Sequence, residues 1–226
     1  MLRQLFRAGA VAAMLAAAFP AMAEETLRLR LNGDVNVLDP IATTNFTIRN
    51  ASYLMYDTLF TLDADYKVQP QMAEGYEVSD DGLTYTITLR DGLKFHDGSD
   101  VTSEDAVASI KRWGTVDGLG KILFSKIDTI EARDGKTMIL TLDEPWGLVI
   151  DALGKISSNV PVIMPKAMAE TPSSEPVKDP IGSGPYMLVP DEWVPGSVVV
   201  FKKFEDYVPR SEPASMASGG KVAHFD

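Results

Sequence analysis

The sequence predicts an α/β fold in which paired β-strands alternate with single helices. At residues 84–89, bulky apolar side chains alternate with threonines, and this period of two is typical of a strand with one buried face. At residues 102–114, apolar side chains recur every three or four positions instead, which is the period of an α-helix. The same succession of alternating and helical segments returns at residues 127–156. Strands and helices that follow one another in this way indicate a mixed α/β fold.

The chain before this block should contribute one strand and one helix. Residues 26–31 alternate leucines with polar residues, which predicts a strand with one buried face. Asp39-Pro40 should interrupt any regular element. Residues 43–45 carry hydroxyl and amide oxygens that can cap the helix that follows. The buried face expected of that helix is Ile48, Ser52, Met55 and Leu59.

Two hairpins and a well-marked helix are expected next. The shorter hairpin falls at residues 57–70, and the longer at residues 73–89, around an Asp-Asp-Gly turn. Thr102 should be the N-cap of the helix, with Asp105 completing a capping box, and a glycine at position 114 should end it. The side chains expected to be buried in this block are Tyr85, Ile87, Leu89, Ala106, Ile110 and Trp113.

A further hairpin is predicted at residues 127–142, because two alternating segments flank an Asp-Gly turn. Trp146 precedes the next helix, and we expect it to pack there rather than to serve as a platform for a ligand. The apolar face of that helix is Val149, Leu153 and Ile156. Three more strands are expected, at residues 160–166, 186–189 and 197–201.

Composition narrows the range of functions. The chain has 226 residues and a net charge of −11, so it is a poor candidate for binding nucleic acid or an anionic membrane. It contains no cysteine, which excludes disulfides, thiolate chemistry, Cys-ligated zinc and iron–sulfur clusters. A globular, acidic, cysteine-free chain of this size can fold as one large domain or two small ones.

The N-terminus has the pattern of a cleaved export signal. Arg3 and Arg7 form a basic start, residues 8–19 are apolar but too few to span a bilayer, and Ala21-Met22-Ala23 is a small-x-small cleavage site. The mature chain should begin at Glu24. The alternative is an uncleaved amphipathic anchor; a lipoprotein anchor would need a cysteine. These features predict signal peptide 1–23 and a soluble protein exported to a Gram-negative periplasm.

Several motifs in order resemble those of the family 5 extracellular solute-binding proteins, the periplasmic receptors of peptide and nickel ABC importers. The E-x-S-D-D-G turn is Glu77–Gly82, and the T-Y-x-x-x-L-R strand is Thr84–Arg90. The K-F-H-D-G loop is Lys94–Gly98, and the T-x-E-D-A helix start is Thr102–Ala106. The segment PIGSGPY at residues 180–186 resembles a later family motif. The plainer alternative is an unrelated hairpin followed by a helix.

The resemblance implies a particular architecture. Residues 24–56 and 161–226 would form part of a periplasmic-binding-protein-like first lobe, and residues 57–160 would be a small α+β domain inserted into it. Members of the family are considerably longer than this chain. We therefore expect a fragment that is truncated before the second lobe. One lobe by itself should bind ligand weakly or not at all.

The resemblance also implies a function and a site. Family members close two lobes around a peptide or similar small solute and deliver it to permease subunits in the inner membrane. The loop before the first helix lies at the ligand cleft in the family, which assigns ligand contacts to Thr43, Thr44, Asn45 and Phe46; the alternative is a plain N-cap loop. No cofactor and no metal are expected. Nickel complexes, haem and oligosaccharides are alternatives to a peptide ligand.

Two other classes of function stay open. A secreted enzyme such as a hydrolase would need a nucleophile beside a base, and no motif places a histidine beside Ser183. His96 is expected to be a surface loop residue that hydrogen-bonds a neighbour such as Asp97, not a metal ligand. A truncated remnant without function is the other alternative. We favour a non-enzymatic binding protein.

Overall fold

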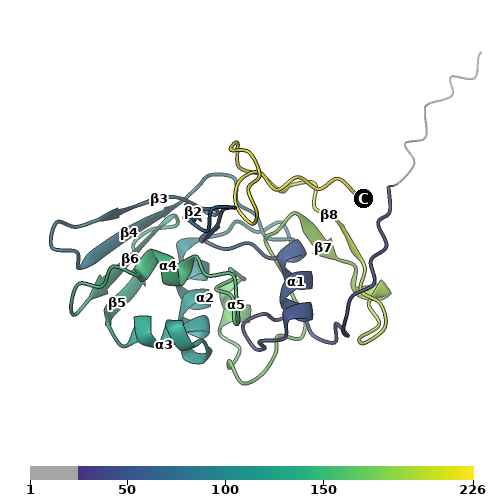
Figure 1. Ribbon diagram of the computed structural model, residues 1–226, viewed down its shortest axis with the longest axis horizontal. Helices are drawn as coiled ribbons and strands as arrows, with labels where there is room; N and C mark the ends of the chain where they lie inside the picture. Colours follow the sequence, from purple (N-terminus) through teal and green to yellow (C-terminus); the bar gives the residue numbers. More distant parts are fainter. Residues whose placement is uncertain (1–24) are drawn as a thin grey trace, which may run out of the picture.

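The computed structural model describes residues 25–226, so the predicted signal peptide and its cleavage site fall outside the described residues. The described chain alternates short helices with antiparallel strands (Figure 1). Its elements are α1 (Phe46–Met55), β1 (Phe60–Leu62), β2 (Val68–Pro70), β3 (Ala73–Val78), β4 (Thr84–Leu89), α2 (Ser103–Val116), α3 (Gly118–Phe124), β5 (Ile127–Ala132), β6 (Thr137–Leu142), α4 (Val149–Leu153), α5 (Lys166–Ala169), β7 (Tyr186–Leu188), a 3-10 turn (Pro190–Glu192) and β8 (Phe201–Lys203).

The largest sheet is antiparallel, with strand order β3-β4-β6-β5, and α2 packs on one face of it. The hairpins predicted at residues 73–89 and 127–142 are therefore confirmed, and they lie side by side through the pairing of β4 with β6. The shorter hairpin predicted at residues 57–70 is confirmed as β1 and β2. The period of two puts alternate side chains of each inner strand against α2. The buried side chains of β4, β6 and α2 include Tyr85, Ile87, Leu89, Met138, Leu140, Leu142, Ala106, Ile110 and Trp113.

The start of α2 is set by the predicted capping box. The Thr102 hydroxyl accepts a hydrogen bond from the Asp105 N–H, and the Asp105 carboxylate accepts one from the Thr102 N–H at 2.8 Å. The helix extends to Val116, two residues beyond its predicted end. Asp117 then caps α3 by accepting hydrogen bonds from the first N–H groups of that helix.

Two predicted strands are wrong. Residues 26–31 form no strand and are exposed, because a strand is stable only when a neighbour accepts its backbone hydrogen bonds, and no described segment pairs with this one. Residues 160–164 are buried as expected, but only Val162 makes a β-bridge, to Thr58. The last strand is displaced from 197–201 to β8, since Val198 closes a tight turn.

One hydrophobic cluster runs from Val35 to Leu188, and it includes side chains from α1, from the sheet and from residues 160–164. This one core includes residues on both sides of the predicted domain boundaries at residues 57 and 160. The division into a lobe and an inserted small domain at these boundaries stays a prediction. Among residues 25–226 there is no helix whose length and apolar character would let it cross a membrane.

Candidate ligand-binding surface

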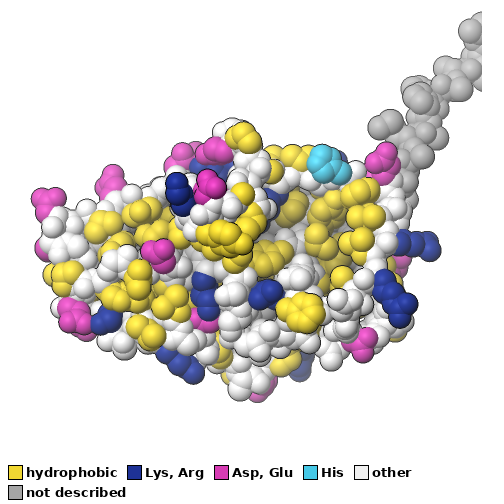
Figure 2. Space-filling model, in the orientation of Figure 1, with side chains coloured by type: hydrophobic (Ala, Val, Ile, Leu, Met, Phe, Trp, Pro, Cys, Tyr) yellow, Lys and Arg dark blue, Asp and Glu magenta, His cyan; other side chains and the backbone are white. Residues whose placement is uncertain are grey.

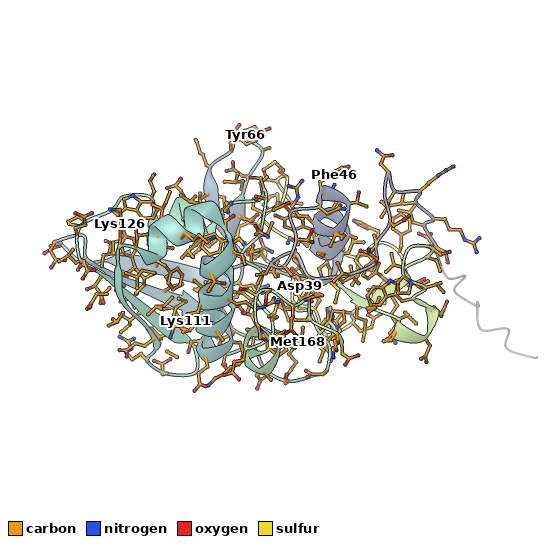
Figure 3. All side chains as sticks on the ribbon, turned by 90° about the horizontal axis from the view of Figure 1, so that it is seen from below. Asp39, Phe46, Tyr66, Lys111, Lys126 and Met168 are labelled. Carbon is orange, nitrogen blue, oxygen red and sulfur yellow. The ribbon has the colours of Figure 1, made fainter. Side chains whose placement is uncertain are left out.

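Helix α1 has one face in the core and one face turned outward. Ile48, Ser52 and Met55 are buried as predicted, together with Thr47 and Ala51. Leu59, which was predicted on the same helical face, is buried but lies beyond the end of the helix at Met55. The opposite side of the helix carries Phe46, Arg49, Asn50 and Tyr53, which recur at intervals of three and four. We call these four residues the outer stripe of α1. Phe46 at its start is 54% exposed, and Figure 3 shows its side chain on the same side of the molecule as Tyr66.

The loop that leads into α1 is held by a buried ion pair. Asp39 accepts two hydrogen bonds from the Arg112 guanidinium of α2, at 3.0 and 2.8 Å, and both side chains are buried. The same carboxylate accepts the N–H groups of Ile41 and Ala42. Figure 3 shows Asp39 inside the molecule, away from Phe46. The backbone before the outer stripe is therefore fixed by the core of the protein.

The four residues that the family resemblance assigns to the ligand lie together on the surface. Thr43 is partly buried, and Thr44, Asn45 and Phe46 are exposed. Asn45 is the N-cap of α1, since its Oδ1 accepts the Thr47 N–H at 2.8 Å. The Thr43 hydroxyl in turn accepts the Asn45 N–H at 3.2 Å. Both side chains therefore shape the helix start, while the side chains of Thr44 and Phe46 remain open to a ligand.

Sequence reasoning did not single out Arg49 or Tyr53. The Tyr53 hydroxyl donates a hydrogen bond of 3.2 Å to the Ile156 carbonyl, and burial raises the pKa of Tyr53 far above its usual value. The Nε of Arg49 is buried and has no hydrogen-bond partner. The signal that could have found both is their spacing from Phe46, which places all three on one face of the helix.

The motif PIGSGPY supports the other end of α1. Gly182 and Gly184 lie directly on the backbone at Met55, where a Cβ at either position would overlap it. Close approach of the two backbones therefore accounts for the glycines at both positions.

His96 locks this motif in place. Its Nδ1 accepts the Gly182 N–H at 3.2 Å, and its Nε2 donates to the Gly184 carbonyl at 3.0 Å, since a carbonyl oxygen only accepts. The predicted partner, Asp97, instead accepts hydrogen bonds from Ser99, so that expectation is wrong. The physical reason is that the glycine motif packs against the loop of His96. The Gly182 N–H and the Gly184 carbonyl then lie within hydrogen-bond distance of the two ring nitrogens. Burial lowers the pKa of His96 below its usual value.

Ser183 is part of the core and has no base beside it. Its hydroxyl accepts the Asp57 N–H at 3.3 Å and donates to the Ile163 carbonyl at 3.4 Å. Both nitrogens of His96 are engaged by backbone atoms of the neighbouring glycines. This arrangement supports a structural role for the serine.

Asp57 connects the C-terminal segment to the body of the protein. Its buried carboxylate accepts hydrogen bonds from Lys221 at 2.9 Å, from the Tyr207 hydroxyl at 2.9 Å and from the Gln71 amide at 3.2 Å. Burial, followed by the charge of Asp57, raises the pKa of Tyr207 well above its usual value. Figure 1 shows the C-terminal segment crossing over β2 on its way to the end of the chain. Residues 209–221 are therefore pinned to the body of the protein.

Two hollows of the described chain lie away from the outer stripe. A groove of about 650 Å³ runs between α2, β5 and α5, and a hollow of about 550 Å³ lies within residues 210–224; neither is lined by residues 43–46. Figure 2 shows acidic and basic side chains scattered over the visible face without a patch of one sign. Among residues 25–226, no group of three or more His, Asp or Glu side chains is placed to hold a metal ion.

Sequence comparison relates the chain to ABC transporter receptors. It is 39% identical over 231 aligned residues to a probable peptide ABC transporter periplasmic-binding protein of Sinorhizobium fredii; the match covers 99% of this chain and 43% of the relative. It is 36% identical to the glutathione-binding protein GsiB of Salmonella typhi, over 84% of this chain and 37% of the relative. The chain thus spans less than half the length of these relatives.

Solved structures give the same relationship. The binding protein AgaA of Agrobacterium tumefaciens R10, in complex with agropinic acid, superposes with a TM-score of 0.65 at 35% identity, over 80% of this chain and 36% of AgaA. The binding protein DppA of Helicobacter pylori, in complex with the peptide STSA, has a TM-score of 0.65 at 25% identity, over 77% of this chain and 38% of DppA. The fold is therefore part of a periplasmic-binding-protein lobe.

The sequence profile described as "Bacterial extracellular solute-binding proteins, family 5 Middle" matches residues 67–226, which is most of the described chain and includes all five motifs in full. The architecture and both relatives agree with this match. The chain belongs to the bacterial extracellular solute-binding proteins, family 5.

Proposed function

We propose that this chain supplies one face of the ligand site of a periplasmic receptor for an ABC importer. The observation that carries the proposal is its similarity, over 99% of its length, to a probable peptide ABC transporter periplasmic-binding protein. The ligand is a short peptide or a solute of similar size. The receptor binds this ligand without catalysis and passes it to permease subunits. Binding is accompanied by closure of two lobes around the ligand.

Within this face, Thr43, Thr44, Asn45 and Phe46 contact the ligand. Their position supports the assignment, because Thr44 and Phe46 are exposed at the start of α1 while Asp39 and Arg112 hold the loop from behind. A rigid loop loses little conformational freedom when ligand binds, which favours affinity. The exposed ring of Phe46 offers apolar contact area to a side chain or to the peptide backbone.

A titration of the ¹⁵N-labelled mature chain, residues 24–226, tests this assignment. Tri-alanine is the probe, and maltotriose is the matched control for a sugar ligand. Because one lobe by itself should bind weakly, both compounds are titrated to high concentration. We expect tri-alanine to shift the amide resonances of residues 43–46 weakly but in a saturable manner, and maltotriose to leave them unchanged. Saturable shifts caused by maltotriose alone would overturn the choice of a peptide, and shifts confined to other parts of the chain would overturn the site.

Export is part of the same proposal. The relative from Sinorhizobium fredii is a periplasmic-binding protein by name, and the first 23 residues have the pattern of a cleaved signal. N-terminal sequencing of protein recovered from the periplasm should begin at Glu24. Material that begins at Met1 would contradict cleavage.

A further inference from the structure

Arg49 is the only charged residue of the outer stripe, and its side chain is not used by the fold. Its Nε is buried without a hydrogen-bond partner, and within the described chain its guanidinium forms no ion pair or side-chain hydrogen bond. A buried donor without an acceptor costs free energy. A hydrogen-bond acceptor on a bound ligand that reaches this guanidinium would remove this free-energy penalty.

The other cations in sheltered positions of this acidic protein are engaged by the fold: Arg90 forms no ion pair and its Nη2 has no partner, but its Nε donates a hydrogen bond of 3.0 Å to the Gln71 carbonyl, and the others are paired. Arg112 pairs with Asp39, Lys221 with Asp57, and Lys155 with Asp117. Arg49 differs from them, although the chain has a net charge of −11 and carboxylates are plentiful. The contrast indicates that the charge of Arg49 serves something other than the folding of this chain.

The surroundings of Arg49 define the chemistry that fits. It lies three residues after Phe46 and four before Tyr53, so an aromatic side chain flanks it on each side along the helix. The Tyr53 hydroxyl is already bound to the Ile156 carbonyl, and the charge of Arg49 opposes the effect of burial on the pKa of Tyr53, as expected of neighbours. A planar guanidinium beside apolar rings matches a carboxylate that is attached to an organic group.

We infer that Arg49 binds a carboxylate group of the solute, while Phe46 packs against the part of the solute next to it. The inference rests on the proposed function and adds to it the chemical class of the ligand: an organic acid, such as a peptide with a free C-terminus. Arg49 would then determine specificity, because an uncharged analogue leaves the guanidinium without its acceptor.

The test compares tri-alanine with its C-terminal amide as probes. Both are titrated into the ¹⁵N-labelled mature chain, and the Nε–Hε resonance of Arg49 is followed together with the amides of residues 46–53. We expect the acid to shift the Arg49 resonance and to bind about tenfold more tightly than the amide, since a charged hydrogen-bonded pair is lost with the amide. Arg49→Gln should remove this preference, and Arg49→Lys should retain part of it.

Arg133→Gln is the matched control, because it removes an exposed arginine from the hairpin of β5 and β6 and changes the net charge equally. It should keep the full preference for the acid. Equal binding of acid and amide by the unmodified chain, or an unchanged preference in Arg49→Gln, would overturn the inference and leave the proposed function standing. If neither probe shifts any resonance of the outer stripe or of residues 43–46, both fail.

Discussion

Individual side chains connect parts of this chain that are far apart in sequence. Asp57 is an example, because its carboxylate lies in the core and binds Lys221 and Tyr207 from the C-terminal segment. The buried carboxylate needs these partners, and the ammonium group needs a compensating charge. The arrangement ties both Tyr207 and Lys221 to one acidic residue, beside the hydrogen bonds that Arg210 donates to the Gln71 and Ala73 carbonyls.

Asp57→Asn should therefore destabilise the protein strongly. Asparagine can keep the hydrogen bond from Tyr207 but leaves Lys221 without its charge partner, which should cost about 3 kcal/mol of unfolding free energy. Urea denaturation measures the loss. Asp100→Asn is the control, since its ion pair with Lys94 is exposed and its loss should leave the midpoint unchanged. Equal midpoints for the two variants would contradict the structural role of Asp57.

His96 makes the stability depend on pH. Burial keeps its pKa below the ordinary 6.5 in the folded state, so the unfolded chain binds more protons at mildly acidic pH. Nδ1 also accepts the Gly182 N–H and cannot do so when protonated. The contribution of His96 is complete above pH 6.5 and is lost as the pH falls from there toward its lower folded pKa.

A comparison with His96→Gln isolates this effect from the titration of carboxylates. The difference in unfolding free energy between the unmodified chain and the variant should be largest near pH 7.5 and should shrink toward pH 5. Chemical denaturation at a series of pH values gives the difference directly. A difference that is constant over this range would show that His96 keeps its ordinary pKa in the fold.

At the scale of elements, α1 depends on a single capping side chain. Asn45 supplies the only cap at its N-terminus, and no acidic residue in the first turn assists it. Asn45→Ala should lower the unfolding free energy by about 1 kcal/mol. Asn50→Ala on the exposed side of the same helix should have no such effect, because alanine is the better helix former. Thermal denaturation that ranks Asn45→Ala at or above Asn50→Ala would contradict the assignment of the cap.

At the scale of the whole molecule, the first described segment is exposed and apolar. Leu27, Leu29 and Leu31 are 51%, 69% and 40% exposed, and they alternate with Arg28 and Arg30. A segment with strand-forming alternation and free backbone groups can pair with the same segment of another copy. The mature chain should therefore self-associate as its concentration rises.

Leu29→Lys should reduce this self-association in sedimentation velocity experiments, since a charge on the apolar side of the segment opposes strand pairing. Ile122→Lys is the control: Ile122 is 50% exposed but lies on α3, where it cannot join a strand. A similar reduction by both variants would attribute the association to general hydrophobicity rather than to residues 26–31.

The secondary-structure elements that were predicted correctly are those that are determined by neighbouring residues. The alternation in β4 and β6 and the capping box of α2 need only neighbouring residues to be read, and both were correct. The strand expected at residues 26–31 failed because its stability depends on a partner elsewhere. Long-range pairs such as Asp39 with Arg112 leave no local pattern at all.

At the candidate site, too, some residues could be reached from the sequence and others only from the structure. Thr43, Thr44, Asn45 and Phe46 were reached through family resemblance, and their ligand role stays a prediction. Arg49 was missed because an arginine within a helix usually lies in solvent, and only the structure shows its buried, unpaired nitrogen. The contacts of His96 were missed because they depend on a loop that lies far along the chain.

The contact of Gly182 and Gly184 with the end of α1 has a consequence for how this protein can evolve. Here backbone lies on backbone, so no side chain can move aside to admit a Cβ. Substitution by alanine or serine, which most surface glycines tolerate, is therefore sterically excluded at these two positions. Random mutagenesis with selection for folded protein should therefore recover both glycines almost unchanged, while Gly75 and Gly135, which have open space around them and no positive φ, should vary more freely.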